Sequence, residues 1–453
     1  MQSRRKFLTY ASACGLAGLT SPVPGVYYHQ AQQNFGDLRV TQIESHDIYP
    51  EYQDFLDYVL MHFYGPSKRT VYIVHTNKGL VGLGESNGAE PETTLQKYIG
   101  TNPFDWIGDE TSLGLGTAMY DLMGKAAGVP VYKLFGQAYR KLVPVGSWTV
   151  SADPSHMADA VRKYSKLGYT WLKFHLSPFE NIFDQLSAME KVAPRGFKIQ
   201  LDFTMHGTND HMPGLCERIG NSAIIGAFED PLFERDIQGY AELRKRSDIP
   251  IYYHHAPLGA TEELQRRAAD GYIVGHTPIG NAIRYAGAFA HANVPFCLQN
   301  VGGHITRSMT THMQAAFKTA HFHFHCDAET WKSDVVNERP LPKRGLLRVS
   351  ESPGLGVTLN RRELERLSDR KPRAQEKWII VTTYEDGTKM YNLGDPADSL
   401  FFVRPDKRRL FTPSYEDPVT TEWWDNDKTK DFRNMMDRLQ KEGVVLLKAN
   451  SDS

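Results

Sequence analysis

The chain has few cysteines, almost no net charge and no long hydrophobic run. Beyond Cys14 only Cys216, Cys297 and Cys326 remain, an odd and sparse set that excludes a disulfide framework. A formal net charge of −1 argues against nucleic acid or an anionic membrane as a partner. A weakly hydrophobic stretch near the N-terminus is too short for stable membrane insertion. With 41% hydrophobic and 23% charged residues, the composition is that of an ordinary folded protein.

The N-terminal residues resemble an export signal. Ser3–Leu8 reads SRRKFL, similar to a twin-arginine signal, and the weakly hydrophobic stretch and Pro22 follow it. We expect residues 1–30 to be a twin-arginine signal segment and the protein to be periplasmic or otherwise exported. The alternative is a disordered basic N-terminus. Because the twin-arginine route carries folded proteins, a metal can be loaded before export.

Short apolar runs recur from Val143 onward at intervals of 22 to 28 residues, starting near 143, 170, 198, 224, 250, 272, 295 and 321. Each interval fits one strand, a loop, a helix and another loop. The segments between them have helical spacing at 156–167, 236–246, 261–269 and 307–320. We predict an α/β fold with a (β/α)8 TIM-like barrel over 141–367, whose function resides at the C-terminal strand ends. A doubly wound sheet is the alternative, but a Gly-rich phosphate turn is missing.

Two further modules flank the predicted barrel. Residues 38–140 form an α+β module, with a hairpin that turns at Asn77-Lys78-Gly79 and a helix over Leu115–Gly128. Residues 368–453 form a C-terminal extension, for which we predict a hairpin beginning at Trp378 and a helix over Lys430–Glu442. The extension has no role that the sequence defines.

Four consecutive predicted strands end in residues that can do chemistry. They close with Lys173-Phe174-His175, with Asp202, with Glu229 and with His254-His255. Asp202 and Glu229 follow neighbouring strands, so both carboxylates can reach one point, where they repel each other unless a cation lies between them. A divalent ion such as Mg²⁺ is a natural occupant. Each carboxylate alone is more often a solvated loop residue, and the four strand ends together favour a site.

Histidine is unevenly distributed, since twelve of the seventeen lie between His175 and His325. His276 ends the sixth predicted strand, Asn300 ends the seventh, and His304 follows in the next loop. His321, His323 and His325 alternate along the eighth predicted strand and therefore share one face. We expect a structural role for His321 and leave His325, nearest the catalytic end, open.

Three stretches carry a family resemblance: GLVGLGES at Gly79–Ser86, AMYDLMGKAAGVPVYKLFG at Ala118–Gly136 and PGLGV at Pro353–Val357. Over roughly Val40–Leu367 the chain resembles the enolase superfamily, of the mandelate racemase and muconate lactonising type. The resemblance implies that 38–140 is a capping domain that shapes the substrate pocket. It also implies Mg²⁺ at the ends of strands three, four and five, and removal of a proton next to a carboxylate.

The chain departs from that family at its strand ends. The resemblance implies that Lys173 contacts the substrate carboxylate, while His175 stands where the usual base is a lysine. His254 or His255 replaces the third carboxylate ligand, and we favour His254. A set of Asp, Glu and His ligands favours Mn²⁺, Fe²⁺ or Zn²⁺ relative to Mg²⁺. The alternative is that neither histidine binds metal and the site has decayed.

The family's Asp–His dyad on strands six and seven is also missing, which leaves His276, Asn300 and His304 as candidates on that side. We expect a metal-dependent lyase or isomerase that acts on a small carboxylate, and we expect a homo-oligomer. We expect dehydration of a hydroxy or sugar acid and rank epimerisation second, because racemisation needs matched bases on both faces of the carbon. One alternative is a catalytically inactive, exported binding protein. Another is a redox or hydrolytic metalloenzyme, for which no nucleophile motif is present.

Overall fold

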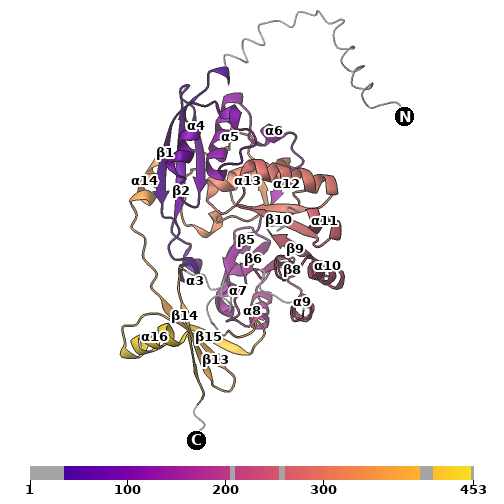
Figure 1. The fold of residues 1–453 in the computed structure, drawn as a ribbon, viewed down its shortest axis with the longest axis vertical. Helices are drawn as coiled ribbons and strands as arrows, with labels where there is room; N and C mark the ends of the chain where they lie inside the picture. The colour runs from indigo at the N-terminus through magenta and orange to yellow at the C-terminus, as the bar shows by residue number, and fades with distance from the viewer. Residues whose placement is uncertain (1–34, 205–209, 255–260, 398–411, 450–453) are drawn as a thin grey trace, which may run out of the picture.

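The computed structural model describes residues 35–204, 210–254, 261–397 and 412–449. Figure 1 shows three bodies, with the N-terminal sheet at the top, the barrel in the middle and the C-terminal module at the bottom. The expected signal segment, Cys14 and His255 lie outside the described residues. Within the described residues every helix is too short or too polar to span a bilayer. Cys216, Cys297 and Cys326 are buried free thiols.

The N-terminal module is an antiparallel sheet of β1 (Val40–Ile48), β2 (Arg69–Thr76) and β3 (Val81–Ser86) in that order. Its helices are α3 (Asp54–Tyr64), α4 (Glu92–Tyr98) and α5 (Leu113–Ala127). The β2–β3 hairpin confirms the predicted turn, and α5 confirms the predicted helix. A Cβ on Gly84 would lie 2.1 Å from the carbonyl oxygen of Gly114. The glycines of GLVGLGES therefore let α5 pack closely on β3.

The barrel is built on seven parallel strands that pair in chain order. They are β5 (Ser147–Val150), β6 (Trp171–His175), β7 (Lys198–Asp202), β8 (Ile225–Glu229), β9 (Ile251–His254), β10 (Gly271–Gly275) and β11 (Phe296–Gln299). Strands β6 to β11 begin within one residue of the predicted starts. The intervening helices are α7 (Pro154–Lys166), α8 (Ile182–Glu190), α9 (Met212–Gly220), α10 (Ile237–Arg246), α11 (Thr261–Arg266), α12 (Ile279–Ala292) and α13 (His304–Ala316).

The first and eighth predicted units differ from a regular barrel strand. The run that starts at 143 divides into β4 (Leu142–Pro144), which pairs with β12 (Leu346–Arg348), and the barrel strand β5. The eighth run makes only two isolated parallel bridges, Val145 to Phe324 and Gln299 to His325. These bridges still join the two edges of the seven-stranded sheet. A Cβ on Gly146 would lie 2.4 Å from Nε2 of His325, so the narrow closure depends on a glycine there.

Four short helical elements remain among the described residues. They are α6 (Tyr132–Phe135), α14 (Arg361–Asp369) and two 3₁₀ turns, Pro103–Trp106 and Ala328–Thr330. After α14, the C-terminal extension forms a sheet in the order β15-β13-β14-β16. Its elements are β13 (Trp378–Tyr384), β14 (Lys389–Gly394), β15 (Val419–Trp424), α16 (Lys430–Glu442) and β16 (Val444–Leu447), which confirm the predicted hairpin and helix.

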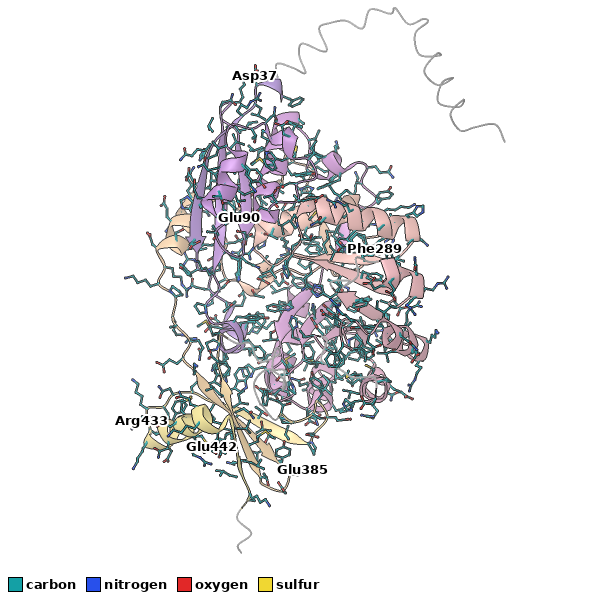
Figure 2. The ribbon with its side chains drawn as sticks, viewed as in Figure 1. Asp37, Glu90, Phe289, Glu385, Arg433 and Glu442 are labelled. Atoms are coloured by element: carbon teal, nitrogen blue, oxygen red, sulfur yellow. The ribbon has the colours of Figure 1, made fainter. Side chains whose placement is uncertain are left out.

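The C-terminal module packs against the capping segment and the barrel. Trp423 of β15 stacks on Tyr58 of α3 with ring centroids 5.3 Å apart, and His62 of α3 lies 2.7 Å from Asp425. The Ile182 amide donates to the carbonyl of Tyr415 at the start of α8. Figure 1 shows α3 between the barrel and this module. Exposed side chains such as Glu385, Arg433 and Glu442 cover the outer surface of the module in Figure 2.

Candidate active site

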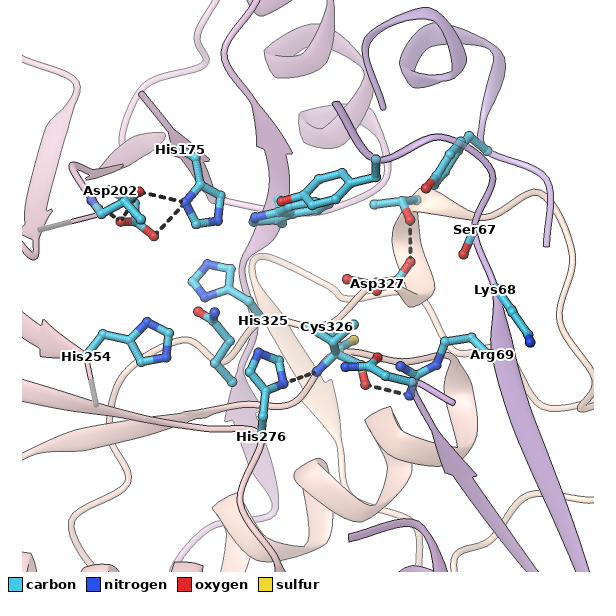
Figure 3. A pocket seen from close by; sticks show the side chains of 18 of the residues that line it. Ser67, Lys68, Arg69, His175, Asp202, His254, His276, His325, Cys326 and Asp327 are labelled. Carbon is cyan, nitrogen blue, oxygen red and sulfur yellow. Dashed lines mark hydrogen bonds and ion pairs between the residues drawn. The ribbon is translucent and has the colours of Figure 1, made fainter. Parts of the chain in front are cut away.

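A cavity of about 620 Å³ lies where the C-terminal ends of the barrel strands meet the capping domain. Its barrel wall comes from the ends of the six strands β6 to β11 and from the end of the eighth run. Its outer wall comes from the end of α3 and the start of β2. Figure 3 shows His175, His254, His276 and His325 around one end and Arg69 and Asp327 at the other. The described lining residues also include Tyr52, Tyr64, Pro66, Ser67, Lys68, Asn87, Trp148, Asp202, Thr204, Asp230, Gln299, Val301, Cys326 and Thr330.

Register brings the predicted strand-end residues together. His175 pairs with Asp202, and Asp202 pairs with Glu229, across β6, β7 and β8. Residues paired in parallel strands point to the same face, so all three side chains enter the barrel interior. Lys173 lies two residues before His175, so its side chain enters the same interior from one level below. The predicted convergence of Asp202 and Glu229 is therefore present.

The cation between the two carboxylates is the ammonium of Lys173. Nζ of Lys173 lies 2.9 Å from Oδ2 of Asp202, 2.7 Å from Oε1 of Glu229 and 2.7 Å from Oε1 of Gln299. These three acceptors use all three N–H groups. Lys173 therefore balances charge inside the barrel, and the substrate contact implied for it stays a prediction.

Burial and the enclosed charges shift the pKa values of the Asp202 and Glu229 carboxyl groups in opposite directions. Burial alone would raise the pKa of Asp202, but His175 and Lys173 outweigh it and hold that pKa well below its usual range. Burial and the nearby Asp202 charge raise the pKa of Glu229 to about 7, against the opposing effect of Lys173. Burial would lower the pKa of Lys173, yet Asp202 and Glu229 raise it overall, so the ammonium stays charged.

Three buried groups form a compact set of metal donors: Glu229, Asp230 and His254 offer ligand atoms within 4.8 Å of one another. Nδ1 of His254 lies 3.0 Å from Oε1 of Glu229. Burial, followed by the charge of Lys173, lowers the pKa of His254 to about 3, so its imidazole is neutral as a metal ligand requires. Two carboxylates and a neutral imidazole are donors that suit a divalent cation, so these residues fit the implied metal.

Asp230 is the donor that the sequence did not single out. Its φ of 45° turns the chain sharply after β8, and its Oδ1 accepts from the backbone amide of His254. Burial, then Glu229 and Asp202, raises its pKa well above the usual range. The signal available in the sequence was an acidic residue between the last strand residue and Pro231. Asp202, which the sequence also suggested as a metal ligand, is not a member of this donor set. The ammonium of Lys173 lies between Asp202 and Glu229.

His175, the predicted base, lines the cavity with 13% of its side chain exposed. Its Nδ1 lies 3.0 Å from Oδ2 of Asp202 and 3.3 Å from the hydroxyl of Thr204. A carboxylate on Nδ1 fixes the ring orientation and supports positive charge on the imidazole after it accepts a proton. Trp148 lies edge-on to the ring, with centroids 6.1 Å apart.

On the opposite side, one of the three predicted candidates lines the cavity. His276 does, with Nδ1 3.3 Å from the amide nitrogen of Val301. Asn300 instead points toward α13 and donates to Thr310, because Gln299 takes the inward position at the end of β11. His304 lies at the start of α13, buried against Asp334 at 2.8 Å. Gln299 therefore lines the cavity where the sequence suggested Asn300, and His304 lies outside the cavity.

The histidines of the eighth run divide into three environments. His321 is exposed, His323 stacks on Trp171 inside the barrel, and His325 lines the cavity. Both ring nitrogens of His325 are buried, and neither has a hydrogen-bond partner among the described residues. Burial and the nearby His323 hold its pKa well below the usual range, so the imidazole is neutral.

Together these features define a barrel protein with a capped, histidine-rich cavity and a carboxylate–imidazole metal set. Residues 156–363 match the family described as Enolase C-terminal domain-like. Arabinonate dehydratase from Saccharolobus solfataricus is 25% identical over 54% of this chain and 69% of that protein. N-succinyl-L-Arg/Lys racemase from Bacillus cereus is 25% identical over 65% of this chain and 89% of that protein.

Solved structures share the fold. An enolase from Pseudomonas fluorescens, solved with bound magnesium, potassium and tartrate, has a TM-score of 0.62 at 18% identity and covers 74% of this chain and 92% of its own. The chain is therefore similar to the enolase superfamily, of the mandelate racemase and muconate lactonising type, most clearly over residues 156–363. Its curated relatives are enzymes, among them acid sugar dehydratases, a racemase and a cycloisomerase.

Proposed function

We propose that this protein is a metal-dependent dehydratase that removes the proton next to the carboxylate of a hydroxy or sugar acid. The observation that carries the proposal is the paired row of His175, Asp202 and Glu229, with His254 3.0 Å from Glu229, at the floor of one cavity. A base, a charge-balancing lysine and metal donors stand together there. This argues against the alternative of an inactive binding protein, in which that grouping has no use.

Glu229, Asp230 and His254 would hold the divalent ion, with Asp202 beside them. When bound, the ion stabilises the negative charge that develops on the substrate carboxylate as the proton leaves. Mg²⁺ is implied by the family, whereas the His254 nitrogen favours Mn²⁺, Fe²⁺ or Zn²⁺ more than an all-oxygen set does.

His175 is the proposed base, and the chain supplies what such a base needs. The imidazole faces the cavity and is oriented by Asp202. The proton that it takes from carbon gives it a positive charge, which the Asp202 carboxylate at 3.0 Å stabilises. His276, on the other side of the cavity, is placed to protonate the departing hydroxyl group.

Dehydration is favoured over epimerisation by the asymmetry of the two sides. Epimerisation requires matched bases on both faces of the carbon, and β10 and β11 present His276 and Gln299 where an Asp–His dyad would stand. Gln299 cannot act as a base, because its amide has no basic lone pair near neutral pH. Arabinonate, gluconate and xylonate dehydratases among the relatives agree with this choice.

The test is metal analysis of protein purified from cells, followed by incubation with a panel of aldonic acids in ²H₂O. We expect a bound divalent ion, exchange of the proton next to the carboxylate, and release of a 2-keto-3-deoxy product. A bound metal with neither exchange nor product on any acid would favour the binding-protein alternative. Exchange with inversion and no loss of water would instead favour an epimerase.

We also propose export through the twin-arginine route and assembly as a homo-oligomer. The SRRKFL stretch supports the first, and Arg4→Lys with Arg5→Lys should leave the protein in the cytoplasmic fraction while the parent reaches the periplasm. The second is supported by β16, an edge strand with Leu446 and Leu447 exposed. Light scattering after size-exclusion chromatography measures the assembly directly, and a monomer mass would exclude it.

A further inference from the structure

The end of the cavity opposite the metal donors carries two cations, Lys68 and Arg69, from the start of β2. Arg69 is 3% exposed, its Nε lies 2.9 Å from Oε1 of Glu85, and one Nη donates to the carbonyl of Val301. Its other terminal nitrogen, Nη1, is buried with no partner among the described residues. A buried guanidinium N–H without an acceptor is costly, so a nearby acceptor from a bound molecule would be favourable.

Both cations at this end already have carboxylate partners. Glu85 balances Arg69, and Asp47 lies 2.6 Å from Lys68 on the outer side. Lys68 and Arg69 are the only lysine and arginine among the described residues that line the cavity. A second carboxylate brought to this end would therefore meet no lysine or arginine in that set whose charge is not already balanced by a carboxylate.

Asp327 adds a third acid to the same end. It follows the eighth run, lines the cavity and lies beside Arg69 in Figure 3. Burial raises the pKa of Asp327 to about 7, the charge of Arg69 opposes that rise, and Glu85 adds to it. Its carboxyl group repels an anion when charged, and in either state it can accept a hydrogen bond from a hydroxyl. The hydroxyl of Ser67 and the amide of Asn87 complete a wall that both donates and accepts.

We propose that Arg69, Asp327, Ser67 and Asn87 form a subsite for the uncharged, hydroxyl-bearing tail of a linear polyhydroxy monocarboxylate. The inference rests on the proposed function, because it assumes that the substrate carboxylate lies at the metal donors. A hydroxyl both donates and accepts, so it matches a wall with an unpartnered guanidinium N–H beside a carboxyl oxygen. A terminal carboxylate can only accept, and it would face Asp327. The cavity, at about 620 Å³, has room for a chain of several carbons.

Matched acids provide the test, because gluconate and galactonate differ from glucarate and galactarate only at the distal carbon. With Mn²⁺-loaded full-length protein, we expect kcat/KM for each aldonate to exceed that for its aldarate at least tenfold. Asp327→Asn should narrow this ratio at least tenfold, mainly by lowering KM for the aldarate. The control Asp54→Asn removes an exposed acid from α3, outside the cavity lining, and should leave the ratio unchanged.

Several outcomes would overturn the subsite. They are aldarates used as well as aldonates, an unchanged ratio in Asp327→Asn, or an equal fall of kcat on both acids, which would place Asp327 at the reacting atoms. Calorimetric titration of the same Mn²⁺-loaded protein separates this inference from the proposed function. Tighter binding of aldonates without turnover supports the subsite and contradicts the dehydratase. Turnover with a preference for aldarates supports the dehydratase and contradicts the subsite. If neither acid binds, both the subsite and the dehydratase are contradicted.

Discussion

The ammonium of Lys173 lies 2.7 Å from Oε1 of Glu229, and both side chains are completely buried. Asp202 shares the same ammonium at 2.9 Å, so one lysine stabilises two carboxylates. The barrel interior therefore contains a cation that the chain itself supplies. Removing one partner of a buried ion pair costs roughly 3–5 kcal/mol, because the other charge is left uncompensated.

The Lys173→Met variant should make stability depend on metal. We expect its melting temperature to fall strongly in EDTA and to recover with Mn²⁺, since a bound cation can replace the lost ammonium. Lys125→Met is the matched control, because Lys125 lies 2.7 Å from the buried Asp121 in the capping domain, away from these donors. It should be destabilised with no metal rescue. Equal melting curves of Lys173→Met with and without metal would contradict the expectation.

His175→Asn tests the base while preserving the contact with Asp202, because the amide nitrogen of asparagine can replace Nδ1 as a donor. Proton exchange next to the carboxylate should fall about 10²–10⁴-fold, the usual contribution of a positioned base. Metal content should remain that of the parent. The exposed His321 supplies the control, and His321→Asn should exchange at the parental rate. Exchange retained in His175→Asn would assign the base elsewhere.

Most of this site could be predicted from the sequence because it depends on period and register. The spacing of the apolar runs located β6 to β11, and the residues at their ends then had to meet. Features that depend on a single backbone turn or on side-chain reach could not be predicted in this way. The positive φ that brings in Asp230, the Lys173 ammonium between two carboxylates and the choice of Gln299 over Asn300 all require coordinates.

The His254→Asp variant should shift metal preference toward Mg²⁺. An imidazole nitrogen favours later transition metals, and an oxygen ligand favours hard cations. We expect the ratio of Mg²⁺ to Mn²⁺ dissociation constants to fall about tenfold, measured by calorimetry on the apoprotein. His276→Gln changes another histidine of the same cavity outside the donor set and should leave that ratio near the parental value. If only His276→Gln changed the ratio of dissociation constants, the nitrogen ligand would be His276, directly after β10, and not His254.

Acid stability should depend on His312 of α13, which lies in a separate small cavity. Its Nε2 lies 3.1 Å from the carbonyl of Leu355, and burial lowers its pKa to about 4 from the usual 6.5. Below pH 6.5 His312 binds a proton in the unfolded chain, whereas in the folded chain it stays neutral until the pH approaches 4. Stability is therefore lost as the pH falls from about 6.5 to about 4, by about 1.4 kcal/mol per pH unit at most.

The His312→Gln variant retains a donor to Leu355 and cannot titrate. Its urea midpoint should fall less than that of the parent over the same pH range. His291→Gln, on α12, provides the comparison for a histidine that is not buried. Parallel curves for parent and His312→Gln would show that the proton uptake lies elsewhere.

The stacking of Trp423 on Tyr58 predicts a role for the C-terminal module in substrate binding. Because α3 ends at Tyr64, which lines the cavity, loosening α3 should weaken that wall. An aromatic pair contributes about 0.5–1.5 kcal/mol, so we expect Trp423→Ala to raise KM roughly two- to tenfold with kcat little changed. The neighbouring Trp424 packs edge-on against Phe432 of α16, on the other face of β15. Trp424→Ala should destabilise the module, measured by melting temperature, while KM stays near the parental value. If both variants raised KM equally, general destabilisation of the module would explain the effect, and a specific contact with α3 would not be required.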